Sequence, residues 1–266
     1  MPQLHAAGSL HGGGILISVV SDDFRFSYDV ANRLKRFGAP FEHLDPGQGI
    51  PKGTMVIIKK GQPRVIMEGS RFTIYGEPED TSVKAWLVSG GLTDWNKDVF
   101  IGIDPGEAPG IAIFSGNTRI TTAHAPAPES VAFYTRTLSQ LVGKERVNVR
   151  IGDGDPTNRD RTIRAVWSTC NQVEMVDERR TSKQAGSDEE AASIIGMTKG
   201  EIVEERPEVI PSEGELRNIQ RKSRLQSGGH TTISRLLAES VARGEKSMEE
   251  AIELQRRAEK GRKASE

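Results

Sequence analysis

The feature of this sequence that most constrains its fold is a series of short apolar runs that begins near residue 98. Three runs follow one another closely, at 99–103, 111–114 and 120–123. Each has the length and the apolar character of a buried strand. Beyond them, stretches with apolar residues at helical spacing alternate with two more apolar runs, at 147–151 and 173–176. This order predicts an α/β fold with a mixed sheet flanked by helices.

Three helices are predicted between and after these strands. Residues 131–142 place their apolar side chains on one helix face. A second helix is expected to begin near Thr157, with Asp160 three residues later as a variant of the capping box. A third is expected to begin at Ser187, which opens a capping box that Glu190 completes.

Composition divides the chain into three expected domains, 1–97, 98–210 and 211–266. The middle one carries the predicted mixed sheet. The first is expected to be a small α/β domain, because short apolar runs and one amphipathic segment alternate in it. The elements expected there are strands at 15–20 and 55–58, a helix at 27–37, and a hairpin within 65–75 that turns at Gly69 and Ser70.

The last part, 211–266, has no strand signal and predicts two or three helices broken at Gly228-Gly229 and at Gly244. Within it, residues 217–235 contain no acidic residue. The run has two interpretations, a solvated helix face or a surface that contacts phosphate groups. Its basic residues are Arg217, Arg221, Lys222, Arg224 and Arg235, of which the first, second and fourth fall on one helix face.

Charge and cysteine content exclude several classes of protein. The chain has 36 Lys and Arg against 37 Asp and Glu, so no global field points to a nucleic-acid or membrane partner. The single cysteine, Cys170, excludes a disulfide framework and a cysteine-based zinc site, and it favours a reducing, cytoplasmic location. No apolar run approaches the roughly 18 residues that a membrane-spanning helix needs.

Acidic residues stand at the ends of three predicted elements in the middle part. Asp104 ends the first strand, Asp153 and Asp155 follow the strand at 147–151, and Asp188 opens the last helix. If the strand ends converge, these carboxylates repel one another unless a hard cation compensates them. Two Mg²⁺ or Mn²⁺ ions about 4 Å apart would then activate water and stabilise the leaving oxygen of a phosphodiester.

Each acidic group also has a structural interpretation. Asp104 starts an Asp-Pro-Gly turn, and the segment 152–156 (GDGDP) reads equally well as a glycine-rich loop. The acids at 188–190 suit the first turn of any helix. In the first domain, Asp22 and Asp23 either hold a metal or cap the next helix, and capping is the commoner role of such a pair.

Four segments of the middle part resemble the RuvC and YqgF branch of the RNase H-like nucleases. GIDPG (102–106), followed by GIAIF (110–114), is similar to the first catalytic strand and its hairpin. VEMVDERRTS (173–182) and SDEEAASII (187–195) resemble the family's later strand and last helix. IGDGDPTNRD (151–160) stands where the family has its second catalytic strand end. The resemblance covers about 98–200.

The resemblance implies a nuclease with two metal ions, either a Holliday-junction resolvase or an RNA-processing nuclease, that works as a homodimer. Asp104 and Asp188 match acidic metal ligands of the family. At the second strand end the family has a glutamate, whereas this chain has Asp153 and Asp155, and either is a candidate. Glu190 is a possible additional ligand. Arg179 and Arg180 match a basic position of the family, and they either contact substrate phosphate or lie on a solvated surface.

Two further functions are compatible with the sequence. The first is a nucleic-acid-binding protein without catalysis, which the departure at GDGDP favours. The second is an ATPase of the actin and Hsp70 type, which also begins with a similar hairpin. That ATPase fold needs two such units, and only one is present in the sequence. The leading hypothesis is therefore a Mg²⁺- or Mn²⁺-dependent nuclease that acts on branched or structured DNA or RNA.

Overall fold

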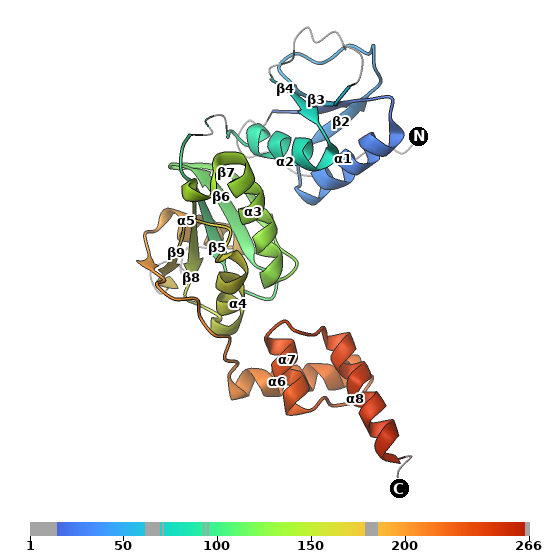
Figure 1. Cartoon of the computed structure of the whole chain (residues 1–266), viewed down its shortest axis with the longest axis vertical. Helices are drawn as coiled ribbons and strands as arrows, with labels where there is room; N and C mark the ends of the chain where they lie inside the picture. Colours follow the sequence, from blue (N-terminus) through green and yellow to red (C-terminus); the bar gives the residue numbers. More distant parts are fainter. Residues whose placement is uncertain are drawn as a thin grey trace. The chain divides into compact units, whose positions relative to one another are not determined.

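The structure is a computed structural model that describes residues 15–61, 70, 72–92, 94, 96–178 and 186–263. The chain is an α/β protein with two sheets and a C-terminal helical region (Figure 1). By its internal packing it divides into two compact units, one formed by 1–97 with 113–123 and the other by 98–112 with 124–266.

The first sheet has four strands in the order β2-β1-β3-β4, and its neighbouring strands run parallel. β1 and β3 are buried on both faces, as central strands of a parallel sheet are. Helices α1 and α2 pack against each other and against this sheet. The elements are β1 (Ile17–Val20), α1 (Phe24–Arg36), β2 (Phe41–Leu44), β3 (Met55–Lys59), β4 (Phe72–Gly76) and α2 (Pro78–Ser89).

The predicted strands at 15–20 and 55–58 and the predicted helix at 27–37 are confirmed. The helix begins earlier, at Phe24, because Asp23 caps it. The hairpin within 65–75 is not confirmed: residues 62–69 and 71 lie outside the described residues, and β4 pairs in parallel with β3. The sequence pattern missed α2, because this helix buries residues on nearly every side and shows no apolar stripe.

The second sheet is mixed and has six strands in the order β10-β9-β8-β5-β6-β7. β5, β8 and β9 run parallel to one another, and β10 is antiparallel to β9. The connections from β5 to β6 and from β6 to β7 are short enough only for antiparallel neighbours. The strands are β5 (Val99–Asp104), β6 (Gly110–Ser115), β7 (Thr118–His124), β8 (Val147–Gly152), β9 (Gln172–Val176) and β10 (Glu201–Ile202).

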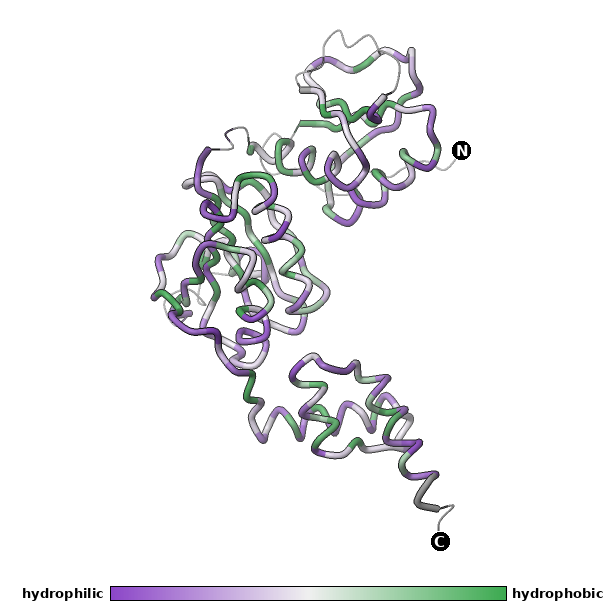
Figure 2. Tube along the Cα trace, viewed as in Figure 1, coloured by the Kyte–Doolittle hydropathy of each residue, from purple (hydrophilic) through white to green (hydrophobic). Residues whose placement is uncertain are grey.

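The three α-helices described around this sheet, α3, α4 and α5, are the ones that were predicted. The two short 3-10 helices, η1 and η2, and the two-residue strand β10 were missed. α5 packs on β5 and β8, while α3 and α4 contact β8 and each other. Hydrophobic residues gather in the strands of the sheet (Figure 2). The helices are η1 (Pro128–Ser130), α3 (Val131–Val142), η2 (Lys144–Arg146), α4 (Pro156–Val166) and α5 (Asp188–Met197).

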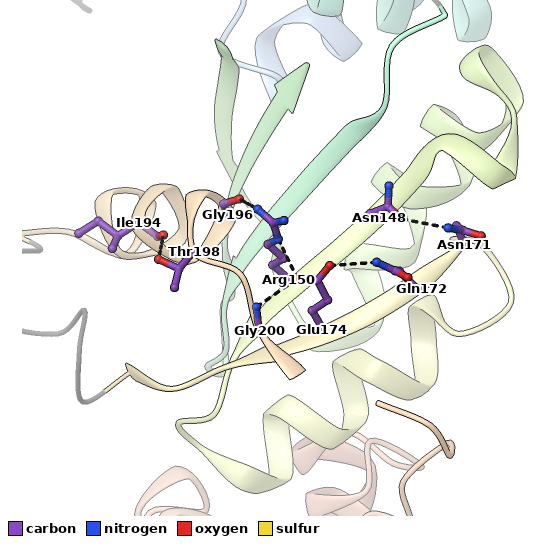
Figure 3. A network of polar contacts seen from close by, with 9 residues as sticks. All are labelled: Asn148, Arg150, Asn171, Gln172, Glu174, Ile194, Gly196, Thr198 and Gly200. Atoms are coloured by element: carbon purple, nitrogen blue, oxygen red, sulfur yellow. Dashed lines mark hydrogen bonds and ion pairs between the residues drawn. The ribbon is translucent and has the colours of Figure 1, made fainter. Parts of the chain in front are cut away.

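A polar network fixes the C-terminal end of α5 on the sheet (Figure 3). Arg150 on β8 donates to the Gly196 carbonyl at 2.8 Å and forms an ion pair with Glu174 on β9, with Nε and Oε2 3.0 Å apart. Glu174 is buried, with only 4% of its surface exposed, and it also accepts from the Gly200 N–H and the Gln172 side chain. β8 therefore bonds to α5 itself through Arg150, and β9 bonds through Glu174 to Gly200 in the chain that follows the helix.

The C-terminal region consists of α6 (Glu213–Gln226), α7 (Arg235–Ala242) and α8 (Met248–Lys263). The expected breaks at Gly228-Gly229 and Gly244 are confirmed, and all three glycines have a positive φ that favours glycine. Within the described residues, no helix is long and apolar enough to cross a membrane. The helices share a core made of Leu216, Ile233, Ala238, Ala242, Ala251 and Ile252.

Candidate functional site

Asp104 ends β5 on the face of the strand that α5 covers. Two residues earlier, Gly102 lies so close to α5 that a side chain at this position would overlap with the backbone of Ala192 and Gly196. Side chains two apart in a strand share a face, so the Asp104 carboxylate also points to the α5 side. It is half-buried, and among the described residues no hydrogen-bond donor or basic side chain contacts it.

The Asp104 carboxyl group is difficult to ionise. Burial raises its pKa from 3.8 to about 6, and the negative charges of Glu178 and Asp188 contribute to the same shift. The three carboxylates come from the end of β5, the chain after β9 and the first turn of α5. The structure therefore brings together acids from three elements, and two of them, Asp104 and Asp188, were predicted as a pair of ligands.

The Glu178 side chain turns back over the loop that follows β8. Its Oε1 accepts a hydrogen bond from the Gly154 N–H at 3.2 Å. A side chain at Gly152 or Gly154 would overlap with this carboxylate, so the two glycines provide the space that it occupies. Burial raises the pKa of Glu178, and the charges of Asp153 and Asp155 raise it further against the opposing effect of the Gly154 hydrogen bond.

Sequence reasoning missed Glu178 as a site residue, although it quoted the segment that contains it. The signal that identifies it is the one used for Asp104, an acid just beyond the end of a buried strand. β5, β8 and β9 are neighbouring parallel strands, so their carboxyl ends meet at one edge of the sheet.

Asp153 and Asp155 surround Glu178 and hold the local backbone. Asp153 Oδ1 accepts the Glu178 N–H at 2.9 Å. Asp155 has a positive φ of 36° and caps α4, its Oδ1 accepting the Asn158 N–H at 3.3 Å. The expected start of this helix near Thr157 is confirmed, but the expectation that Asp160 takes part in its cap is wrong. The helix begins at Pro156, because Asp155 supplies the cap and proline suits the first helical position.

At the start of α5 the predicted capping box is confirmed. Ser187 Oγ accepts the Glu190 N–H at 3.3 Å, and Glu190 Oε2 accepts the Gly186 N–H at 2.7 Å. The Glu190 carboxylate is thus engaged with the helix terminus, and Glu189 pairs with His124 at 2.7 Å. Asp188 is exposed, and its carboxylate has no partner among the described residues.

The donors of this carboxylate cluster, defined as Asp104, Glu178 and Asp188, have the chemistry of a magnesium or manganese site. Carboxylate oxygens are the hard ligands that these ions prefer. In the described part of the chain, however, no three Asp, Glu, His or Cys side chains lie close enough together to hold an ion as they stand. Binding one would require the three carboxylates to approach one another.

The predicted phosphate-contacting residues fall into two sets. Arg217, Arg221 and Arg224 are exposed on α6, and Lys222 beside them pairs with Glu107. The face of α6 that packs inward carries the buried residues instead. The other predicted basic residues, Arg179 and Arg180, lie outside the described residues.

In the acidic pair after β1, Asp22 and Asp23, the structure shows the capping role that was expected to be the commoner one. Asp23 Oδ1 accepts the Phe26 N–H at 3.0 Å and caps α1. Its Oδ2 forms an ion pair with Lys59 at the end of β3, 2.5 Å away, and this contact is the main reason that the pKa of Asp23 is lowered. The capping interpretation is confirmed.

Two segments of the chain match known domain families. Residues 16–84 match a response regulator receiver-like domain. This segment runs from β1 into α2. Residues 212–259 match a three helical bundle domain, and they include α6, α7 and most of α8. No curated protein and no solved structure matches the chain.

These matches correct the family identification. The families found are a receiver-like domain and a three-helix bundle, and neither is an RNase H-like nuclease family. The resemblance to the RuvC and YqgF branch is therefore contradicted, and so is the classification of the chain as a nuclease of that branch. The motifs behind it have local structural causes. SDEE (187–190) is a capping box at the start of α5. In GDGDP (152–156), the two glycines leave space for the Glu178 carboxylate, and Asp155 caps α4.

Proposed function

We propose that the part of the chain at 98–210 binds a divalent cation at Asp104, Glu178 and Asp188 and hydrolyses phosphodiester bonds of a structured DNA or RNA. The observation that carries the proposal is the half-buried Asp104 carboxyl, whose pKa is raised by burial and by the charges of two other acids and which no basic group contacts among the described residues. The proposal rests on these side chains and not on membership of a nuclease family.

The energetics of the cluster favour a cation. Burial and the negative charges of Glu178 and Asp188 raise the pKa of Asp104 to about 6, so this carboxyl is still mostly ionised at neutral pH. The repulsion that remains can be relieved by a bound cation with a preference for oxygen ligands. A metal ion bound there would activate a water molecule and stabilise the leaving oxygen of a phosphodiester.

The protein's own groups prepare the site. Gly152 and Gly154 let the Glu178 carboxylate approach, and the Gly154 N–H orients it. Gly110 lies directly against the backbone of Asp188, which brings the start of α5 close to the sheet. The exposed arginines of α6 would bind backbone phosphates of the substrate.

The test is cleavage of branched DNA, RNA–DNA hybrid and structured RNA with Mg²⁺ or Mn²⁺. Asp104→Asn and Glu178→Gln are each expected to lower the rate by at least about 100-fold, since each removes a charged ligand. Asp160→Asn is the matched control, because Asp160 pairs with Arg159 and has no part in the cluster. Metal-dependent cleavage that survives Asp104→Asn would refute the assignment.

A second candidate function is nucleic-acid binding without catalysis. It is favoured by the absence, among the described residues, of three acids close enough to hold an ion, and by the engagement of Asp153 and Asp155 in backbone hydrogen bonds. Tight binding of a structured nucleic acid, with no cleavage of any of the three substrates, would select this alternative.

We also propose that the second sheet has an RNase H-like arrangement, and this part of the proposal concerns the fold alone. It is supported by the order of β7, β6, β5, β8 and β9 and by the parallel pairing of the last three. One fold hosts many functions, so this order does not carry the activity. The cytoplasmic location also remains a proposal, supported by the free thiol of Cys170, and the predicted homodimer remains a prediction.

A further inference from the structure

A hollow of about 220 Å³ lies at α4, and none of the residues that line it belongs to the carboxylate cluster. Four arginines from three segments line it: Arg161 and Arg164 on α4, Arg206 in the chain after β10, and Arg243 at the end of α7. Glu129 is the one acid in its lining. None of the four arginines was among the basic residues predicted to contact phosphate.

The hollow carries an excess of positive charge. Four guanidinium groups and one carboxylate give a formal charge of 4 − 1 = +3. The Glu129 carboxylate is already engaged by Arg161, whose Nε and Nη2 donate to its two oxygens at 2.8 and 2.9 Å. The other three guanidinium groups have no acidic partner among the described residues.

Backbone groups hold two of these arginines in place. Arg164 Nη1 donates to the Pro207 carbonyl at 2.9 Å, and Arg206 Nη2 donates to the Arg164 carbonyl at 3.3 Å. These bonds tie the chain after β10 to α4 and leave most of each guanidinium's donors unused, because a guanidinium has five N–H groups. The two arginines are therefore prearranged without being neutralised.

The turn after α7 places the fourth arginine beside them. Gly244 has a φ of +71°, and a side chain there would overlap with the Glu129 carboxylate and the Arg161 guanidinium. The positive φ favours glycine at 244, and the turn that it makes places the neighbouring Arg243 in the lining of the hollow. Arg243 is exposed, and the described residues offer it no hydrogen-bond or ion-pair partner.

We propose that this arginine hollow binds a phosphate group of a nucleic-acid backbone. The choice of a nucleic acid rests on the proposed function, whereas the choice of phosphate rests on the hollow itself. Arginine donates paired, parallel hydrogen bonds that match phosphate oxygens. The volume of 220 Å³ is below the roughly 300 Å³ at which pockets for drug-sized ligands begin, so it suits one phosphate group rather than a whole nucleotide.

The experiment measures binding of single-stranded, duplex and branched DNA and of structured RNA by fluorescence anisotropy, without divalent metal, between about 50 and 200 mM salt. Arg243→Gln and Arg206→Gln are each expected to weaken binding of every sequence alike and to lower the slope of log K against log salt by about one. Arg136→Gln is the matched control, since Arg136 is an exposed arginine on α3 without a partner among the described residues. It should change neither quantity.

The outcomes separate this inference from the proposed function. If the wild type binds nucleic acid and both variants keep its affinity and salt slope, the arginine hollow is refuted while the carboxylate site stands. If Asp104→Asn abolishes cleavage but keeps the salt slope of binding, and Arg243→Gln lowers that slope, the carboxylate site and the arginine hollow both stand. A titration with inorganic phosphate, monitored through the NMR signals of the arginine Nε–H groups, tests whether the hollow binds free phosphate instead. If inorganic phosphate saturates the hollow and no nucleic acid binds, the assignment of the hollow to a nucleic-acid phosphate is overturned.

Discussion

At the scale of single residues, the surroundings of the Asp104 carboxylate decide whether this residue only forms a turn or also belongs to a functional site. Pro105 and Gly106 after Asp104 let the chain reverse into β6, so the turn interpretation holds for the backbone. It does not account for the Asp104 side chain, whose pKa is raised to about 6 by burial and by the charges of two other acids. Asp155 shows the converse case, because its carboxylate is accounted for by the cap of α4.

The raised pKa of Asp104 makes stability depend on pH. Between pH 3.8 and about 6 the folded state binds more protons than the unfolded state, so the free energy of unfolding falls as pH rises through this window and then levels off. The full shift corresponds to about 3 kcal/mol, and exposure of the carboxyl to solvent reduces the expected loss to about 1–2 kcal/mol. Urea unfolding in chelator at several pH values measures it.

Asp104→Asn should remove most of this dependence and should be more stable than the wild type at pH 7 in chelator. The Glu178 carboxyl, whose pKa is also raised, leaves a smaller slope of the same sign. Equal losses of stability in the two proteins between pH 4 and 7 would show that Asp104 is ionised normally in the folded state.

Substitutions at Asp155 distinguish a cap from a ligand. Asparagine accepts the same hydrogen bond from the Asn158 N–H and tolerates a positive φ, so Asp155→Asn should keep cleavage and most of the stability, losing only the hydrogen bond that Asn158 Nδ2 donates to Asp155 Oδ2. Asp155→Ala loses the cap and should cost about 1–2 kcal/mol in chemical unfolding. A large loss of cleavage in a stable Asp155→Asn protein would instead make Asp155 part of the site.

At the scale of elements, the site depends on how α5 is held against the sheet. Glycine at 102 and 110 allows the close approach of the helix, and Arg150 donates to the Gly196 carbonyl near its C-terminal end. Arg150 also lies over the Phe100 ring, 4.3 Å from its centroid. Because Asp188 opens the same helix, anything that loosens α5 also moves one member of the carboxylate cluster.

Arg150→Met is expected to destabilise the protein by about 3–5 kcal/mol, because it leaves the buried Glu174 carboxylate without its partner. Adding Glu174→Met should recover a large part of that loss, since the unpaired charge is then gone. Thermal unfolding of the two single variants and the double variant forms a double-mutant cycle. Strictly additive losses would contradict a coupled pair.

At the scale of the whole molecule, the chain combines parts with separate cores. The C-terminal helices enclose their own apolar cluster, and the segment 212–259 matches a three helical bundle domain. The N-terminal sheet likewise lies in the segment 16–84 that matches a receiver-like domain. The carboxylate cluster lies in neither matched segment.

A fragment of residues 207–263 is expected to fold on its own, with helical circular dichroism and a cooperative but low thermal transition, because a core this small stabilises only marginally. Ile233 is almost fully buried in that core, so Ile233→Ala in the fragment should cost about 2–4 kcal/mol and leave it largely unfolded. Leu225→Ala is the control, since Leu225 is exposed. A fragment without cooperative melting would mean that the bundle needs the rest of the chain.

Much of the fold could be predicted from the sequence, because burial on one face leaves a period in the chain. The strands from β5 to β9 and the helices α3, α5 and α6 follow from that period, and the breaks at Gly228-Gly229 and Gly244 follow from glycine's freedom at positive φ. α2 and β10 could not be found in this way, since one is buried nearly all round and the other is only two residues long.

The sequence by itself determined that acids stand at the ends of several elements, Asp104 and Asp188 among them. Which of them face each other depends on the order of β5, β8 and β9 in the sheet, and no local pattern encodes that order. Only the tertiary structure turned Asp153 and Asp155 toward backbone N–H groups and brought Glu178 toward Asp104. Contacts between residues far apart in the chain, and the burial that they produce, set the charge state of the site.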